Sequence, residues 1–186
     1  MKRPADVDTE PPRLLPSRQL PPYSYVSGKF PHPTRDPTGH SYGAAEPPVI
    51  IDHEARWREC DAYLWGLDLF NNGYYWEAHE TWEAVWHAAG RRGPLADFAK
   101  SLIKLAAAGV KAREGRANGV RRHAERAKEL LKSLESVTGR GQQYFMGLSI
   151  PALQQYAQQL VHDPVALLNT SDEAVVRVIQ FALLPK

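Results

Sequence analysis

The stretch FNNGYYWEAHETWEAVW, residues 70–86, decides the local fold of this chain and holds its most informative chemistry. The Asn-Asn-Gly segment predicts a tight turn, because these residues tolerate the left-handed conformation that ends a helix. Apolar and aromatic residues then recur at helical spacing, which predicts a helix over residues 74–89. Tryptophans stand beside a histidine and several glutamates here. This combination indicates either a functional site or a polar cluster that is satisfied inside the core.

The predicted helix has an apolar face and an outer face when each residue is stepped by 100°. The apolar face is formed by Tyr75, Ala78, Trp82, Val85, Trp86 and Ala89. The outer face is formed by Glu77, Thr81, Ala84 and Ala88, with Trp76 and Glu80 lying between the two faces. His79 falls inside the apolar face, and Glu83 lies on its border one turn later. We expect both side chains to be more than half buried, and hydrogen-bonded to each other or to a third polar group.

Two interpretations of the His79-Glu80-x-x-Glu83 pattern compete. In the first, His79 and Glu83 form an internal brace between core tryptophans. In the second, the pattern is half of a metal site or an acid/base site. A zinc protease helix carries His-Glu-x-x-His, with both histidines on one face. Glu83 stands where the second histidine would be, and glutamate is also a zinc ligand, so the pattern permits a metal. We favour the brace, because structural ion-pair networks produce similar clusters.

Helical spacing predicts further helices over about residues 52–70, 94–113, 117–137 and 151–162. Residues 170–173 resemble the capped, acidic first turn of a sixth helix, although residues 172–183 also suit a strand. Gly73 and Gly115 each close a turn, giving two helix–turn–helix pairs similar to tetratricopeptide repeats. Two such pairs are too few for an open solenoid. The sequence therefore predicts an all-α fold, a compact bundle of five to six helices.

The N-terminal segment, residues 1–50, differs in composition from the rest of the chain. It contains 11 of the 15 prolines and few periodic apolar positions. Proline lacks a backbone donor and fixes φ, which excludes a regular helix or a central strand. We predict a Pro-rich extended or disordered segment followed by one helical domain over residues 51–186. We also expect that residues 1–45 are dispensable for folding.

The composition of the 186-residue chain excludes several classes of protein. A single cysteine, Cys60, excludes an internal disulfide framework. No apolar run reaches membrane-span length and no signal-peptide pattern follows Met1, so we expect a cytoplasmic protein with no membrane contact. Basic residues gather on one side of the helix over residues 117–137, among them Arg121, Arg122 and Arg126. We interpret them as a solvated face, and the lack of any recognition signature argues against nucleic acid.

Three segments of the chain resemble a known family. They are Phe70-Asn-x-Gly73, Tyr75-Trp76-Glu77-Ala78-His79-Glu80-x-x-Glu83-x-x-Trp86 and Ser101-Leu-Ile-x-Leu-Ala-Ala107. In this order and spacing they resemble domain of unknown function family 309, over about residues 57–160. The resemblance implies a small all-α domain built around the His-Glu-x-x-Glu-x-x-Trp helix. It implies no established activity, although some members are labelled as predicted metal-dependent hydrolases.

The chain departs from the family pattern at one place. In the family a histidine often follows the Ala-rich run of the helix that comes after the His-Glu-x-x-Glu helix. This chain has Gly109-Val110-Lys111 there. The resemblance therefore supplies no third ligand from that helix, and His123 on the next helix is the main substitute.

The function that we predict is small-ligand or partner binding. Asn71, Trp76, His79, Glu83 and Trp86 would line or brace the binding pocket. The partner would be a small molecule or a protein, self-association is left open, and no cofactor is expected.

The alternative function is that of a metal-dependent hydrolase using a divalent metal. Here His79, Glu80 and Glu83 are the catalytic candidates, and His79, Glu83 and His123 are the candidate metal ligands. Glu80 would activate a bound water. Under the favoured brace, His79, Glu83 and His123 do not converge on one point, and His123 lies about 8 Å or more from His79, a helix-packing distance.

Overall fold

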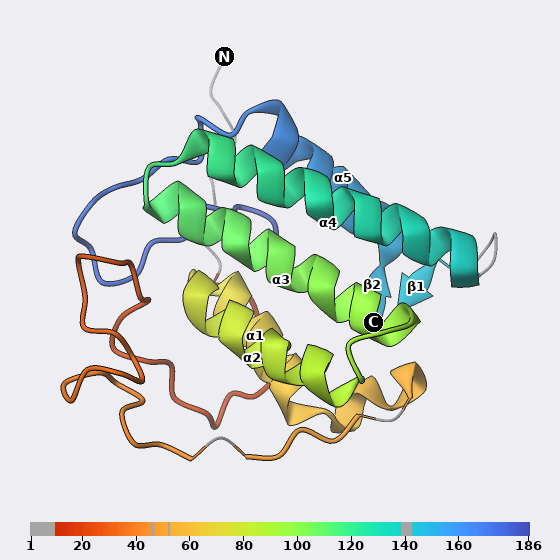
Figure 1. Ribbon diagram of the computed structural model, residues 1–186, viewed down its shortest axis with the longest axis horizontal. Helices are drawn as coiled ribbons and strands as arrows, with labels where there is room; N and C mark the ends of the chain where they lie inside the picture. The colour runs from red at the N-terminus through yellow and green to blue at the C-terminus, as the bar shows by residue number, and fades with distance from the viewer. Residues whose placement is uncertain (1–9, 46, 52, 139–142) are drawn as a thin grey trace.

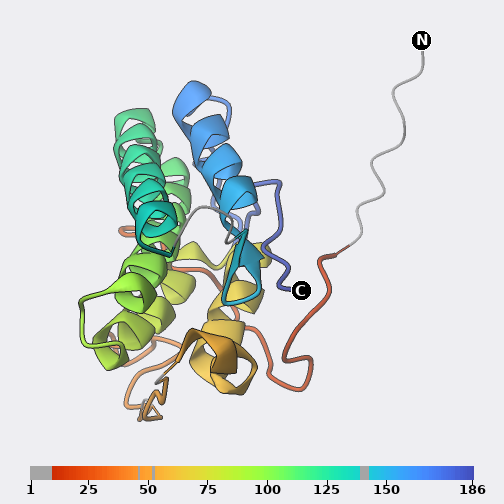
Figure 2. The same ribbon diagram turned by 90° about the vertical axis from the view of Figure 1, so that its right-hand side faces the viewer.

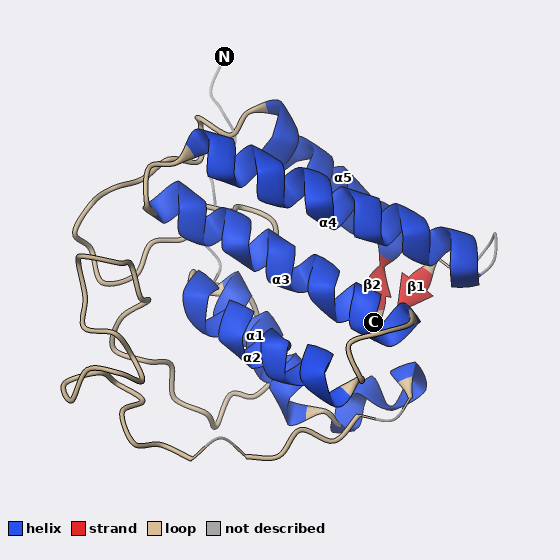
Figure 3. Ribbon diagram, in the orientation of Figure 1, coloured by secondary structure: helices blue, strands red, loops and turns tan. Residues whose placement is uncertain are grey.

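In the part of the chain that the structure describes, five α-helices and one 3-10 helix form the fold (Figures 1 and 3). The computed structural model describes residues 10–45, 47–51, 53–138 and 143–186. Its helices are η1 (Glu54–Glu59), α1 (Asp61–Asn71), α2 (Tyr75–Ala88), α3 (Pro94–Arg113), α4 (Ala117–Thr138) and α5 (Ile150–His162). Each α-helix contacts the next along the chain, and α4 and α5 lie side by side in both views (Figure 2). The predicted all-α bundle is confirmed.

A two-stranded antiparallel hairpin connects α4 to α5. Its strands are β1 (Tyr144–Phe145) and β2 (Leu148–Ser149), in the register that pairs Tyr144 with Ser149. Met146 takes a positive φ of 46° at the turn, where Gly147 follows with a φ of 78°. The carbonyl of Met146 accepts a hydrogen bond from the buried Tyr63 hydroxyl at 2.8 Å, which fixes the hairpin to α1.

The predicted helix over residues 52–70 is divided in two. Cys60 has φ −94° and ψ 89°, which breaks the helical path between η1 and α1. Its side chain is buried, so it is a small core residue, and burial raises the pKa of its thiol. The two predicted glycine turns are present, since Gly73 and Gly115 have φ values of 89° and 73° between paired helices. A likeness of these pairs to tetratricopeptide repeats stays a prediction.

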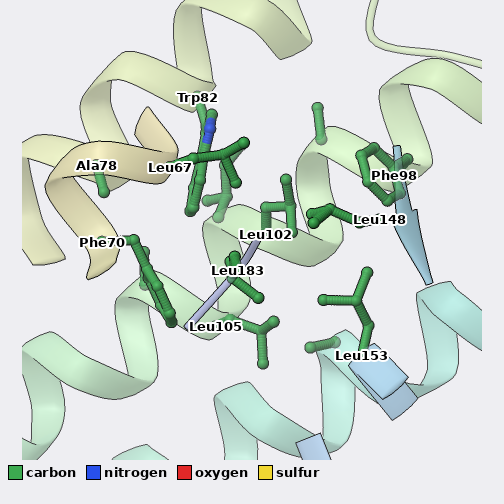
Figure 4. Packing of buried hydrophobic residues seen from close by; sticks show 14 of the residues in the cluster. Leu67, Phe70, Ala78, Trp82, Phe98, Leu102, Leu105, Leu148, Leu153 and Leu183 are labelled. Atoms are coloured by element: carbon green, nitrogen blue, oxygen red, sulfur yellow. The ribbon is translucent and has the colours of Figure 1, made fainter. Parts of the chain in front are cut away.

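The core is centred on Trp82 of α2, whose side chain is fully buried. Its indole ring lies against Gly66 of α1, where a Cβ would come within 2.2 Å of the indole nitrogen. The same nitrogen donates a hydrogen bond to the carbonyl of Tyr63 at 3.3 Å. Figure 4 shows Trp82 beside side chains of α1 and α3, with Leu183 of the C-terminal segment in the same cluster. The apolar face predicted for α2 is therefore the face that forms the core.

The C-terminal segment, residues 163–186, contains neither helix nor strand in the structure, so the predicted sixth helix is wrong. Side chains of the bundle bind its backbone instead. The buried Arg113 guanidinium donates to the carbonyls of Asn169, Ser171 and Glu173 at 3.0, 3.2 and 2.9 Å. In a helix, backbone carbonyls accept hydrogen bonds from N–H groups of the same segment. Here the Arg113 side chain donates to these carbonyls instead, so a tertiary contact takes the place of local helix formation.

Tyr75 and Asn71 hold the later part of the C-terminal segment. The buried Tyr75 hydroxyl accepts a hydrogen bond from the Ile179 N–H at 2.9 Å, and burial raises the pKa of Tyr75 to about 12. The Asn71 amide donates to the Leu183 carbonyl at 3.0 Å and accepts from its N–H at 2.7 Å. Asn71, predicted as a binding residue, therefore lies in the core as a tether for this segment.

The N-terminal strap, defined here as residues 10–45, is an extended segment that lies along α1 and α2 (Figure 1). It has no helix or strand, as its prolines predict. Two carboxylates of the bundle bind its backbone. The fully buried Asp68 accepts hydrogen bonds from the N–H groups of Leu14 and Leu15 at 2.7 and 2.9 Å. Arg13 adds an ion pair to Asp68 at 3.0 Å.

Glu77 is the second carboxylate that holds the N-terminal strap. It accepts hydrogen bonds from the Tyr25 N–H at 2.8 Å and the Ser24 hydroxyl at 3.1 Å. The prediction that Glu77 lies on an outer face is wrong, because the strap covers this side of α2 and leaves the Glu77 side chain only 6% exposed. Because two buried carboxylates depend on the strap, we expect that residues 10–45 contribute to stability, in contrast to the expectation that the N-terminal segment is dispensable.

The Asp68 contacts make a prediction that mutagenesis can test. Asp68→Asn replaces a charged acceptor of two strap N–H groups, so the free energy of unfolding should fall by about 1–3 kcal/mol. Urea denaturation followed by circular dichroism measures this loss. Asp172→Asn is the matched control, because the Asp172 side chain is 93% exposed and pairs only with Lys29, so its loss should change stability little. Equal stability of the two variants would contradict the anchoring role of Asp68.

Candidate functional site

The residues predicted for the site lie on two different sides of α2. Trp76 and Glu80 face a cavity beneath the N-terminal strap. His79 and Glu83 lie on the side towards α3 and α4, where the charges of His79 and Glu83 act on His123 and Lys104 respectively. Trp86 also lies on this second side, with the Lys100 ammonium 5.3 Å from its ring centroid. The single site expected from the sequence is therefore two neighbouring regions that share one helix.

His79, Glu80 and Glu83 form a compact cluster in which Glu80, at the edge of the cavity, meets the two residues of the second side. Each offers one ligand atom, and these atoms lie within 4.8 Å of one another. His79 Nδ1 is 3.3 Å from Glu80 Oε1, and His79 Nε2 is 4.0 Å from Glu83 Oε1. The His79 and Glu83 side chains are 24% and 42% exposed, so both are more than half buried. The hydrogen bond of His79 goes to Glu80, and Glu83 lies at ion-pair distance.

His123 of α4 lies near this cluster but outside the group of three. Burial is the main cause that lowers the pKa of His123 to about 4. The positive charges of Lys104, Arg122 and Lys111 lower it further, and His79 adds a smaller effect. At neutral pH the His123 imidazole is uncharged, which is the form that a metal ligand needs.

Lysines of α3 border the same region. Burial lowers the pKa of Lys104, the nearby Lys100 ammonium lowers it further, and Glu83 opposes the shift. Lys100 is also placed over the ring of Trp86. The acidic cluster of α2 therefore faces basic side chains of α3 and α4, which balances charge across this part of the bundle.

A cavity of about 420 Å³ lies between the N-terminal strap and helices α1 and α2. Its walls include Trp65 and Leu69 of α1, Trp76 and Ala84 of α2, and residues 47–50 of the chain that leads into η1. The volume lies within the range of cavities that bind small molecules, and the mixed apolar and polar lining is also typical of them.

A histidine–carboxylate pair forms part of the cavity wall. His40 Nε2 lies 3.3 Å from Glu77 Oε1, and both side chains are only 6% exposed. The other ring nitrogen of His40 lies 2.8 Å from the Ser41 hydroxyl. The sequence analysis missed this pair because His40 comes from the Pro-rich strap, where no periodicity places a side chain. The one feature of the sequence that could have indicated this pair is Glu77, an acidic residue of the helix predicted over residues 74–89.

Trp76 connects the cavity to the N-terminal strap. Its ring centroid lies 5.2 Å from that of Tyr25 and 5.3 Å from that of His32, in edge-to-face arrangements. Such pairs of aromatic rings are favourable beyond their burial. Trp76 thus lines the cavity and holds the segment that covers it.

The fold and these two regions define a helical domain in which the Trp-rich α2 packs between α1 and α3. Residues 63–123 match the family model described as domain of unknown function (DUF309). The match begins in α1 and ends in α4, so it contains the whole of α2 and α3. This match supports the resemblance predicted from the sequence, over a shorter span than the predicted residues 57–160. No curated protein and no solved structure matches the chain significantly. Across the described ranges, no helix has the length and apolar character that a membrane span requires.

The lowered pKa of His123 predicts how stability changes with pH. The ordinary pKa is 6.5 and the folded value is about 4, so between these values the unfolded chain binds more protons than the folded one. The contribution of neutral His123 is complete above pH 6.5 and is lost as the pH falls towards 4. Thermal unfolding should therefore show a flatter pH dependence for His123→Asn than for the wild type over this range.

The matched control for this experiment is His87→Asn. His87 is exposed on α2 and not buried as His123 is, so its replacement should leave the pH dependence of stability close to that of the wild type. A wild-type slope in His123→Asn would contradict the buried, neutral state of His123.

Proposed function

We propose that this protein binds a small organic molecule in the cavity beneath the N-terminal strap. The observation that carries the proposal is the cavity itself, about 420 Å³ with tryptophan rings of both α1 and α2 in its lining. A ligand of roughly ten to twenty non-hydrogen atoms would fit such a space. The strap that covers the cavity is fixed at Asp68 and Glu77, so the walls are preorganised in the absence of ligand.

The chemistry of the lining supports an organic ligand. Trp65 and Trp76 supply large apolar surfaces, and proline and aliphatic side chains of residues 47–50 add to them. Polar groups at the same wall, including Glu80 and Thr81, would orient the ligand. Within this proposal Trp76 is a binding residue, as the sequence predicted, whereas His79, Glu83 and Trp86 lie outside the cavity lining.

A cavity-filling substitution tests this proposal. Ala84→Leu places a larger side chain in the cavity wall at a helical position that leucine tolerates well. A fragment library of small amines, carboxylic acids and neutral amides, screened by ligand-observed NMR, should give binders of the wild type that Ala84→Leu does not bind. Ala88→Leu is the matched control, one turn later on the exposed part of α2, and should keep the binding. Equal binding to both variants would place the ligand elsewhere.

A second candidate function is that of a metal-dependent hydrolase, and the convergence of His79, Glu80 and Glu83 favours it. Imidazole and carboxylate are suitable ligands for a divalent ion such as zinc. Two ligands of one tetrahedral ion lie roughly 3.4 Å apart, so the 4.0 Å from His79 Nε2 to Glu83 Oε1 requires only a small adjustment. The residues therefore fit a metal in part, and His123, on which the charge of His79 acts, is a candidate for a further ligand.

The role of each residue in this second candidate follows from its position. A divalent ion would act as a Lewis acid towards an ester, amide or phosphoryl group. His79 and Glu83 would hold the ion. Glu80, beside His79, would accept and return a proton. Lys104 of α3 would place a positive charge next to the cluster.

Metal binding is tested directly by titration. Under the second candidate, isothermal titration calorimetry with Zn²⁺ should show one ion for each chain, and His79→Ala should weaken the affinity by about tenfold or more. His87→Ala is the matched control, because His87 lies two turns further along α2 and outside the cluster. Unchanged zinc affinity in His79→Ala would exclude His79 as a metal ligand, and equal weakening in both variants would contradict a site confined to the cluster.

A further inference from the structure

The cavity beneath the N-terminal strap carries an excess of negative charge. Four carboxylates belong to its lining: Glu59, Asp61, Glu77 and Glu80. The cationic side chain in the lining is that of Arg18, and His40 is paired with Glu77. Apolar walls reduce the screening of these charges by water, so the potential inside the cavity favours a positively charged ligand.

Glu80 is the carboxylate best placed to bind such a ligand. Glu77 already accepts from Ser24, Tyr25 and His40, which uses most of its acceptor capacity. Glu59 is paired with Arg56, and the charge of Asp61 acts on Arg18, the cation of the lining. Glu80 has one hydrogen bond, to His79 at 3.3 Å, and its side chain is 43% exposed. The Glu80 carboxylate therefore has further hydrogen-bond acceptor positions that neither the core nor the strap uses.

The aromatic walls also suit a cation. The Arg18 guanidinium lies 4.3 Å from the ring centroid of Trp65, which shows that this ring face accepts a positive charge within the cavity. Arg18 keeps this position without an ion pair to Asp68, because the Asp68 carboxylate pairs with Arg13. Trp76 provides a second indole in the same lining, its own contacts with Tyr25 and His32 being edge-to-face.

We propose that the ligand of this cavity is an organic amine, protonated at neutral pH, with an aromatic or aliphatic body. The ammonium group binds the Glu80 carboxylate, and the apolar body lies against Trp65 and Trp76. The ammonium donates hydrogen bonds to a charged acceptor, which is stronger than a bond between neutral groups. This inference rests on the proposed function, since it names the class of molecule that the cavity takes.

Matched probes separate the charge of the ligand from its shape. The probes are phenethylamine and tryptamine, together with the alcohol and the carboxylic acid that carry each carbon skeleton. Isothermal titration calorimetry on the full chain at neutral pH measures each affinity. The amines should bind about tenfold or more tightly than the alcohols, and the carboxylates should bind more weakly than the alcohols.

Two variants locate the charge that the amine recognises. Glu80→Gln keeps the size of the side chain and removes its charge, so amine affinity should fall about tenfold while alcohol affinity stays unchanged. Glu125→Gln on the exposed face of α4 is the matched control and should bind as the wild type does. Circular dichroism melting curves of both variants establish that they are folded.

The outcomes distinguish this inference from the proposed function. Amines that bind the wild type more tightly than alcohols, and lose this preference in Glu80→Gln, support the inference. If alcohols or carboxylates bind as tightly as the amines, and Ala84→Leu abolishes their binding, the inference that the ligand is an amine is overturned. The cavity then remains a binding site. Probes of all three kinds that fail to bind overturn both. If Glu80→Gln still binds amines more tightly than alcohols, the claim that Glu80 binds the ammonium group is overturned.

Discussion

The close approach of α2 to its two neighbouring helices is the constraint on which the rest of the structure depends. Trp82 lies against Gly66 of α1, and a Cβ at Gly109 of α3 would come within 2.4 Å of the Tyr75 ring. These glycines let two large aromatic rings of one helix enter the interfaces on both sides. Tyr75 is then deep enough to bind the C-terminal segment through its hydroxyl. Gly109 thus provides the space into which the Tyr75 ring packs.

Local patterns predicted the helices and the turns between them. The spacing of apolar residues placed α2 to α5 within a few residues of their observed ends, because each of these helices buries one continuous face. The sequence analysis did not place the N-terminal strap or the C-terminal segment. Their backbones bind Asp68, Glu77, Asn71 and Arg113, side chains that lie more than 50 residues away in sequence. The spacing of apolar residues along the chain gives no information about such distant contacts.

The candidate site was predictable only in part for the same reason. The motif on α2 drew attention to Trp76, His79 and Glu83, but helical geometry alone assigned them to one region. The strap divides them by covering one side of α2 and building a cavity there. Glu80 lies at the boundary, because it is part of the cavity lining and also accepts the His79 hydrogen bond. Occupation of one region would therefore change the charge that the other experiences.

The contact between the two ends of the described chain has a consequence for biosynthesis. The Ser24 N–H donates to the Ala174 carbonyl at 2.8 Å, and Lys29 binds carbonyls of Thr170 and Ser171. The strap emerges from the ribosome about 150 residues before these partners are synthesised. At ordinary elongation rates this interval lasts roughly 8–30 s. The helices meanwhile expose the face that the C-terminal segment later covers. A nascent chain would thus make these contacts only once residues 170–174 have left the ribosome, long after the residues that line the cavity.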